Sequence, residues 1–417
     1  MAQASSERRT TRAARLAWPV RLTTVLLVAA VVAAAGPRAQ TSTAIDGHLA
    51  AGKHAMYRLQ YGVAEQAFEQ IVRQHPDRPV GYGMLSVLRW NTLLAAASNS
   101  VLDPYGTPTP YLDRPIYEPI EDERRRFHEA NNRLLALCDR ILAADPDNTE
   151  ALYFKGVVYE NRAAEALTIS GDRWGAVGPG REAKGLHERV LARDPGFVDA
   201  RVSVAVYEFA LATVPALAEV VLFVPRLFGF LRGDKQEAFE LMASVGRSGR
   251  YRNLDAMVAL SLMQAVEGDP NRSVAILQDL GRRYPENYVL DLSVAAIQAR
   301  NARDPRAALA TYQTLLRSLP AKTPGLGAGE VHFWIGQTHI RLGELDEARA
   351  AFERALRAPT AERETVPLSY FHLGVIHEQL GAVRQAATAF RQVVALAAAM
   401  KSLQDQVETA HEKLRSI

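Results

Sequence analysis

Two stretches near the C-terminus share one residue pattern: GEVHFWIGQTHIRLGELDEARAAFERA at residues 329–355 and YFHLGVIHEQLGAVRQAATAF at residues 370–390. Each places Gly, His, Gly, Ala and Phe at identical spacings, which in the first copy are Gly336, His339, Gly343, Ala348 and Phe352. This pattern predicts an antiparallel helix pair. The first glycine lets the two helices approach closely, the second forms the turn between them, and the aromatic residue lies on the second helix. Such a pair cannot bury its apolar face alone, so it must stack on neighbouring pairs.

Four earlier stretches follow the same order more loosely. In the first of them, Gly52 and Phe68 hold the positions of Gly336 and Phe352. Proline has a fixed φ and no N–H donor, so it cannot continue a helix. Such residues follow predicted helices at Pro76, Pro146, Pro195, Pro285 and Pro320.

These patterns resemble the tetratricopeptide repeat family over about residues 44–417, whose unit has about 34 residues. The resemblance implies an all-α protein, an α-solenoid of antiparallel helix pairs with irregular insertions. Residues 401–417 would form a polar C-terminal capping helix. A family of this kind presents a surface to other molecules.

A narrower resemblance lies in the middle of the chain. The motifs that carry it are GPGREA at 178–183, DPGFVDA at 194–200 and GDKQEA at 233–238. They are similar to exported bacterial tetratricopeptide repeat proteins and, more loosely, to the tetratricopeptide repeat 39 and inclusion-body-clearance group. Neither resemblance transfers a catalytic motif.

The predicted organisation has four parts. They are a signal peptide or uncleaved anchor at 1–39, an irregular array at 40–320 with insertions at 98–119 and 169–181, a linker at 321–329, and two regular repeats with the capping helix at 330–417.

The N-terminal part has the anatomy of a secretory signal. Residues 1–39 hold six arginines and one glutamate, and an apolar run follows at 22–35. Cleavage after Ala35 or Ala39 would give a periplasmic or envelope-associated protein, and a retained anchor is the alternative. Without this part the chain has 43 basic and 45 acidic residues, so it lacks the excess of positive charge that is typical of nucleic-acid-binding proteins.

Motifs for catalysis and cofactors are also missing from the sequence. His-Glu pairs occur at residues 128, 187, 377 and 411, but none has the second histidine four residues later that a helical zinc site needs. Histidines also stand at 332, 339, 372 and 377, but His339 and His377 occupy the same position in adjacent repeats and are interpreted as packing residues rather than as metal ligands. Cys138 falls where Phe352 stands in the clear copy and is expected to be buried. We therefore expect no enzyme activity, no cofactor and no metal.

Two segments leave alternatives open. Residues 171–181, GDRWGAVGPGR, are interpreted as an ordered inter-helix loop anchored by Trp174, with an anion-binding loop as the alternative. Residues 209–231 are mostly apolar but contain Pro215, Glu219, Pro225 and Arg226, which disfavours a transmembrane helix. This segment could be buried core, an apolar lip for a partner, or a membrane-surface segment.

The predicted function is a scaffold exported to the bacterial envelope that binds a peptide or helix of another protein on its concave face. The alternative is a membrane-associated assembly factor that uses residues 209–231. Stacked first helices would align the predicted partner contacts, Phe333, Gln337, Arg341, Phe371 and Glu378. The Lys and Asn pattern of a carboxylate clamp is missing at these positions.

Overall fold

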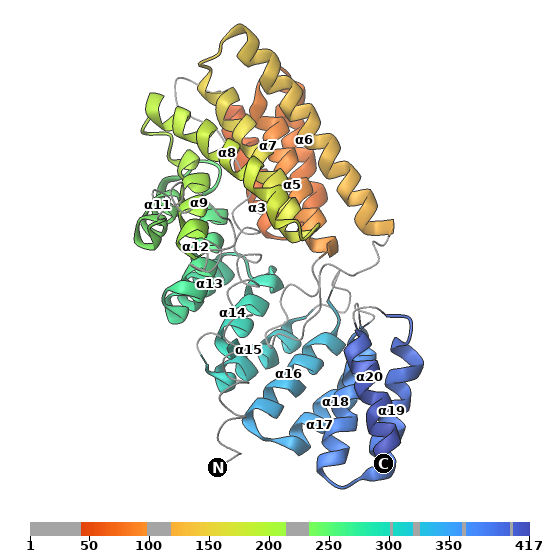
Figure 1. Ribbon diagram of the computed structural model, residues 1–417. Coiled ribbons are helices and arrows are strands. Elements are labelled where there is room, and N and C mark those ends of the chain that lie inside the picture. The colour runs from red at the N-terminus through yellow and green to blue at the C-terminus, as the bar shows by residue number, and fades with distance from the viewer. Residues whose placement is uncertain are drawn as a thin grey trace, which may run out of the picture. The chain divides into compact units, whose positions relative to one another are not determined.

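The computed structural model describes residues 43–97, 118–213, 233–300, 303–319, 326–360, 364–400 and 403–417. Helices make up nearly all of these residues, and within these ranges no β-strand is formed (Figure 1). The all-α prediction is confirmed. The signal peptide and most of the insertion at 98–119 lie outside the described residues, so their predicted roles stay predictions.

The chain divides into two compact units, the first formed by residues up to 93 and by 121–276, the second by residues 94–120 and 277–417, so one boundary, at Ile276–Leu277, falls inside a helix. The helices of the first unit are α3 (Thr43–Tyr57), α4 (Tyr61–Gln74), α5 (Pro79–Ala97), α6 (Glu118–Ala144), α7 (Thr149–Thr168), α8 (Arg173–Arg193), the short 3₁₀ helix η2 (Val198–Ala200), α9 (Arg201–Thr213), α11 (Lys235–Ser248) and α12 (Asn253–Glu267). Helix α13 (Pro270–Arg283) crosses the boundary. The helices of the second unit are α14 (Tyr288–Arg300), α15 (Pro305–Ser318), α16 (Ala328–Leu342), α17 (Leu345–Arg357), α18 (Thr365–Gln379), α19 (Val383–Ala397) and α20 (Gln404–Ser416).

Consecutive helices pack as pairs within each unit. In the first unit α3 packs on α4, α7 on α8, and α9 on α11. In the second unit α14 packs on α15, α16 on α17, and α18 on α19, while α20 covers α19 as the predicted cap. The first helix of one pair also contacts the second helix of the preceding pair, which is the stacking that a repeat array requires.

Polar side chains begin several helices. Asn148 accepts a hydrogen bond from the backbone N–H of Ala151, and Asp304 accepts one from that of Ala307. Each oxygen satisfies an N–H group that has no partner inside its own helix. Gly343 ends α16 with a φ of +77°, a left-handed conformation that glycine adopts without a steric penalty.

The predicted close approaches between paired helices are present. A Cβ atom on Gly336 would lie 2.9 Å from the ring of Phe352, and one on Gly374 would lie 2.6 Å from the ring of Phe390. Both rings are fully buried. The glycine therefore makes room for the aromatic ring of the second helix in each repeat.

The interpretation of residues 171–181 as an inter-helix loop is wrong. Only residues 169–172 connect α7 to α8, which then runs through Pro179. Asp172 starts the helix by accepting a hydrogen bond from Gly175 N at 2.7 Å. Trp174 does not anchor a loop, because its exposed fraction is 69%.

The prediction that Cys138 is buried is confirmed. Cys138 is buried, and desolvation raises the pKa of its thiol, so the thiolate form is disfavoured. Among the described helices none is both long enough and apolar enough to cross a membrane.

Candidate functional site

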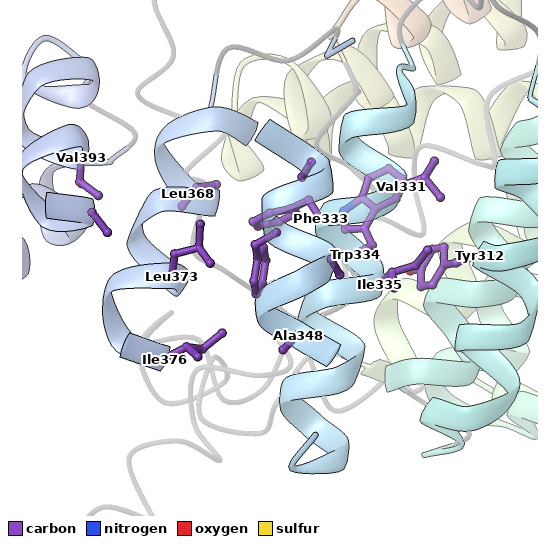
Figure 2. Packing of buried hydrophobic residues seen from close by; sticks show 14 of the residues in the cluster. Tyr312, Val331, Phe333, Trp334, Ile335, Ala348, Leu368, Leu373, Ile376 and Val393 are labelled. Carbon is purple, nitrogen blue, oxygen red and sulfur yellow. The ribbon is translucent and has the colours of Figure 1, made fainter. Parts of the chain in front are cut away.

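Two of the predicted partner contacts, Phe333 and Gln337, are buried, with exposed fractions of 6% and 5%. The Phe333 ring lies 5.6 Å from that of Phe352 and 5.7 Å from that of His372, between centroids. Figure 2 shows Phe333 between its own helix and the helix that carries Leu368 and Leu373. Phe333 therefore joins α16 to α17 and α18 as a core residue, because an aromatic ring at the junction of three helices buries most of its area there.

The other three predicted contacts are more accessible. Arg341 is exposed in the last turn of α16, and Phe371 is half-buried on α18. Glu378 is also half-buried and forms an ion pair with Lys413 of α20, with 2.7 Å between the two groups. These residues lie on the first helices of the two regular repeats. That they bind a partner stays a prediction.

Gln337 has an unusual hydrogen-bonding state. Its Nε2 atom is buried and has no hydrogen-bond acceptor among the described residues. A buried amide that makes no hydrogen bond destabilises the fold by about 1–3 kcal/mol. The nitrogen has almost no exposed surface, so an acceptor from another molecule could reach it only if neighbouring side chains moved.

Two of the C-terminal histidines, His372 and His339, contact other side chains of the protein. His372 stacks on Phe352 with 5.0 Å between centroids, and burial lowers its pKa to about 4. His339 shares a hydrogen bond with Glu344, with 2.7 Å between Nδ1 and Oε2. In the described ranges there is no group of three or more His, Cys, Asp or Glu side chains that could hold a metal ion.

The first unit contains buried charges that were not predicted. We call them the inner polar cluster, and its members are Lys53, Tyr57, Glu160, His187, Asp199, Arg252 and Asp255. Tyr57 is half-buried, and the other six members are buried. They come from α3, α7, α8, η2 and the start of α12.

The centre of this cluster is an ion pair between Arg252 and Glu160, with 3.0 Å between Nη2 and Oε2. Burial raises the pKa of Glu160, and the charge of Arg252 opposes that shift. His187 lies beside the pair, with Nδ1 2.6 Å from Ser203 Oγ and Nε2 2.9 Å from the carbonyl oxygen of Tyr153. Because both nitrogens are engaged and burial lowers its pKa to about 3, His187 is a neutral structural residue.

The rest of the cluster fastens η2 and α3 to the start of α12. Asp199 accepts three backbone hydrogen bonds, from the N–H groups of residues 250, 251 and 252, at 2.8 to 3.1 Å. Lys53 Nζ donates to the carbonyl oxygen of Arg250 at 2.6 Å, and Tyr57 donates to Asp255 at 2.8 Å. Helix α3 is thereby attached to residues about 200 positions later in the chain.

A hollow of about 350 Å³ lies between α4, α5 and α6. Its walls combine apolar side chains with charges of both signs, and they include Glu65, Leu85, Arg89, Glu129 and Arg133. Arg89 is ion-paired with Glu65. The hollow thus has no dominant charge and fits no particular ligand class.

The sequence did not predict the inner polar cluster, because the residues that form it are far apart in the chain. Glu160 and Arg252 are separated by 92 positions. One signal was available: Glu160 and Asn161 of α7 stand at positions that the helical period places among buried apolar residues. A polar residue at such a position needs a buried partner.

Comparison with known proteins places the recognised repeats at the C-terminal end. The tetratricopeptide repeat family matches residues 293–363 and again residues 368–400. The sequence has no match among curated proteins.

Solved structures with a similar fold are distant. A tetratricopeptide repeat protein from Parabacteroides merdae is 13% identical, with 79% of this chain and 98% of that chain covered at a TM-score of 0.30. Human IFIT1, solved as a dimer with m7Gppp-AAAA, is 14% identical, with 95% and 86% covered at a TM-score of 0.43. At these scores nothing about the ligands or arrangement of this chain follows from them. The two family matches and the paired helices show that the chain contains tetratricopeptide repeats at residues 293–363 and 368–400.

Proposed function

We propose that this protein is a scaffold exported to the bacterial envelope, where it binds a peptide or helix of a partner protein. Tetratricopeptide repeats are protein–protein interaction scaffolds, which supports the general part of the proposal. Its most direct support on this chain is that the first helices of the regular repeats present an exposed Arg341 and a half-buried Phe371.

Export is supported by the basic and apolar segments within residues 1–39. N-terminal sequencing of the protein from envelope fractions is expected to begin at Gly36 or Gln40. A chain that begins at Met1 in the same fractions would instead support the retained anchor. Recovery in the cytosol alone would contradict both forms of the proposal.

The proposed partner site lies on the first helices of the regular repeats, α16 and α18. Once neighbouring side chains move aside, a carbonyl group of the partner would accept the hydrogen bond that the buried Gln337 Nε2 does not make within the protein. Arg341, Phe371 and Glu378 belong to the same two helices and would supply a cation, an apolar ring and a carboxylate. Phe333 supports this surface through its packing.

Substitution of Gln337 by Leu separates this role from a structural one. Replacing a buried unsatisfied amide by an apolar group of similar size should leave stability unchanged or raise it. The same change should weaken binding of a partner identified by co-purification from envelope fractions, by about fivefold to tenfold.

A matched control is available on the second helix of the next repeat. Val383 of α19 is exposed, so Val383→Ala should change neither stability nor binding. If Gln337→Leu is as stable as the parent and binds the partner equally well, the site lies elsewhere. A variant that loses binding and stability together would also count against the proposed role.

The absence of catalytic motifs and the neutral, fully bonded state of His187 favour a role without catalysis. The alternative, a membrane-associated assembly factor, depends on residues 209–231. Only 209–213 of that segment are described, as the end of α9.

A further inference from the structure

Two neighbouring repeat junctions of the second unit are built around the same contact between aromatic rings. At the first, Trp334 of α16 stacks on Tyr312 of α15, with 5.8 Å between the ring centroids. At the second, His372 of α18 stacks on Phe352 of α17, with 5.0 Å between the centroids. Trp334 and His372 hold equivalent positions, each two residues before the glycine that faces the paired helix. The second junction therefore contains a ring that can take up a proton, whereas the rings of the first junction cannot.

The surroundings of His372 suit a neutral ring. Its Nε2 atom is shielded from solvent and has no hydrogen-bond partner among the described residues. A neutral imidazole can leave this nitrogen without a hydrogen, whereas both nitrogens of a charged ring are donors. Charging the ring would therefore bury an N–H group without an acceptor beside Phe333 and Phe352, and burial of such a group is unfavourable.

A second histidine at this junction meets the same obstacle. The Nδ1 atom of His332, on α16, is shielded from solvent and has no hydrogen-bond partner in the described ranges. Burial lowers the pKa of His332, and the positive charge of Arg354 on α17 lowers it further. Helix α17 thus packs against α16 and α18, each of which carries a histidine whose surroundings oppose a positive charge.

The other charged groups around the junction include both signs. Burial lowers the pKa of His377 on α18, while the charges of Arg349 and Glu353 act on it in opposite directions. Glu330 of α16 accepts a hydrogen bond from the hydroxyl of Thr365 at 3.2 Å. The ion pairs are Arg349 with Asp346, Arg357 with Glu353, and Glu378 with Lys413. Among the described residues no carboxylate pairs with His332 or His372, so neither ring would have a counter-charge when protonated.

We propose that the junction of α16, α17 and α18 is an acid-sensitive switch, in which protonation of His332 and His372 separates α18 from the preceding repeat. Both rings hold a proton less tightly when packed than when solvated, so opening becomes easier as the pH falls below 6.5. Repeat arrays are held together by interfaces between neighbours, so one weakened interface frees the repeat beyond it and leaves the preceding repeats folded.

The switch has a consequence for the partner site, which rests on the function proposed above. That site lies on α16 and α18, so opening of the junction would divide it, and acid would release the partner. The switch itself does not require a partner, and it can be measured on the protein alone.

Hydrogen exchange of the protein without a partner tests the switch. Amides of α18 and α19 report on the second junction, and amides of α14 and α15 report on the first. Between about pH 6.5 and about pH 5, the opening constant of α18 should rise after correction for intrinsic exchange rates. Each histidine should contribute up to about tenfold per pH unit, so the two together should contribute up to about 100-fold. The amides of α14 and α15 should change much less.

Substitutions that keep an aromatic ring separate protonation from packing. His372→Phe and His332→Tyr should each reduce the pH dependence at α18 by about tenfold per pH unit, and the double variant should nearly abolish it. Tyrosine suits the second change because Tyr370 holds the equivalent position in the next repeat. The converse change, Trp334→His, should make the amides of α14 and α15 sensitive to acid.

His339→Gln provides the matched control, because this histidine of α16 shares a hydrogen bond with Glu344 and so has a carboxylate beside it. It should leave the pH dependence at α18 unchanged. Opening at α18 that does not depend on pH, or that keeps its full pH dependence in the double variant, would overturn the proposal. Equal acceleration at α14, α15 and α18 in the parent protein would also overturn it, since general acid unfolding would then be the cause. A partner that binds elsewhere would contradict the proposed site and leave these exchange results unaffected.

Discussion

Arg252 and Glu160 form an ion pair that is shielded from solvent, with side-chain exposed fractions of 0% and 5% and 3.0 Å between Nη2 and Oε2. The pair links the start of α12 to the middle of α7 inside the first unit. We infer that the pair favours one arrangement of these helices, because moving either side chain would separate a buried charge from its ion-pair partner.

Removing one member of this pair should therefore destabilise the protein strongly. Glu160→Gln removes the nearest counter-charge of the buried Arg252, and the free energy of unfolding is expected to fall by about 3–5 kcal/mol. Replacing both residues, Glu160→Leu with Arg252→Met, should be neutral or stabilising. Urea denaturation followed by circular dichroism measures both changes.

The exposed pair Arg73 and Glu69, 3.0 Å apart in α4, provides the control. Glu69→Gln should change stability by about 0.5 kcal/mol or less. Equal effects at Glu69 and Glu160 would mean that water reaches the inner polar cluster.

Asp199 should be needed to hold the segment before α12. Asp199→Ala removes the acceptor of three buried backbone N–H groups, and each unsatisfied group costs about 1–3 kcal/mol. Hydrogen exchange at residues 250–252 is expected to accelerate more than exchange in α16. Unchanged protection at 250–252 would show that other acceptors replace the carboxylate.

Replacing two helical glycines by alanine should change the stability of the fold in opposite directions. At Gly336, a Cβ would lie 2.9 Å from Phe352, so overpacking should destabilise the fold by about 1–3 kcal/mol. At Gly185, no atom lies within 4 Å, so the better helix propensity of alanine should stabilise it by up to about 1 kcal/mol. Thermal denaturation of the two variants tests the pair, and a stabilised Gly336→Ala would show that the two helices are further apart than described.

The Phe352 side chain should carry much of the stability of the regular repeats. It is fully buried beneath Gly336, so Phe352→Ala is expected to lower the free energy of unfolding by about 3–5 kcal/mol. Denaturant titration measures the loss. A value below about 1 kcal/mol would be incompatible with a filled position at this helix junction.

Stability should decrease in acid partly through His372. Burial lowers its pKa to about 4 from an ordinary value of 6.5, so the unfolded chain binds its proton at a higher pH than the folded chain. Its contribution is therefore present above pH 6.5 and is lost as the pH falls toward 4, by up to about 3 kcal/mol. His372→Phe keeps the stacking on Phe352 and should reduce the difference in stability between pH 7.5 and 4.5. An identical pH dependence in the variant would exclude His372 as a source.

The repeats could be recognised from the sequence because their information is local. Gly336, Gly343 and Phe352 lie within one helix pair, and their spacing alone indicates close approach, turn and core. The C-terminal cap and the burial of Cys138 followed from the same register. The prediction of a loop at 171–181 was wrong. Asp172 caps α8 there, and the helix continues through the glycines and the proline that follow.

The sequence by itself determined the class of fold, the paired helices and the core aromatic of each regular repeat. Those features depend on helical periodicity and on contacts between neighbours in the chain. Tertiary structure alone decided that Phe333 is core, that Gln337 has a buried donor without an acceptor, and that Lys53 bonds to the carbonyl of Arg250. It also decided that Arg252 meets Glu160. Burial and long-range pairing depend on how stacked helices curve together, and the repeat pattern does not encode that geometry.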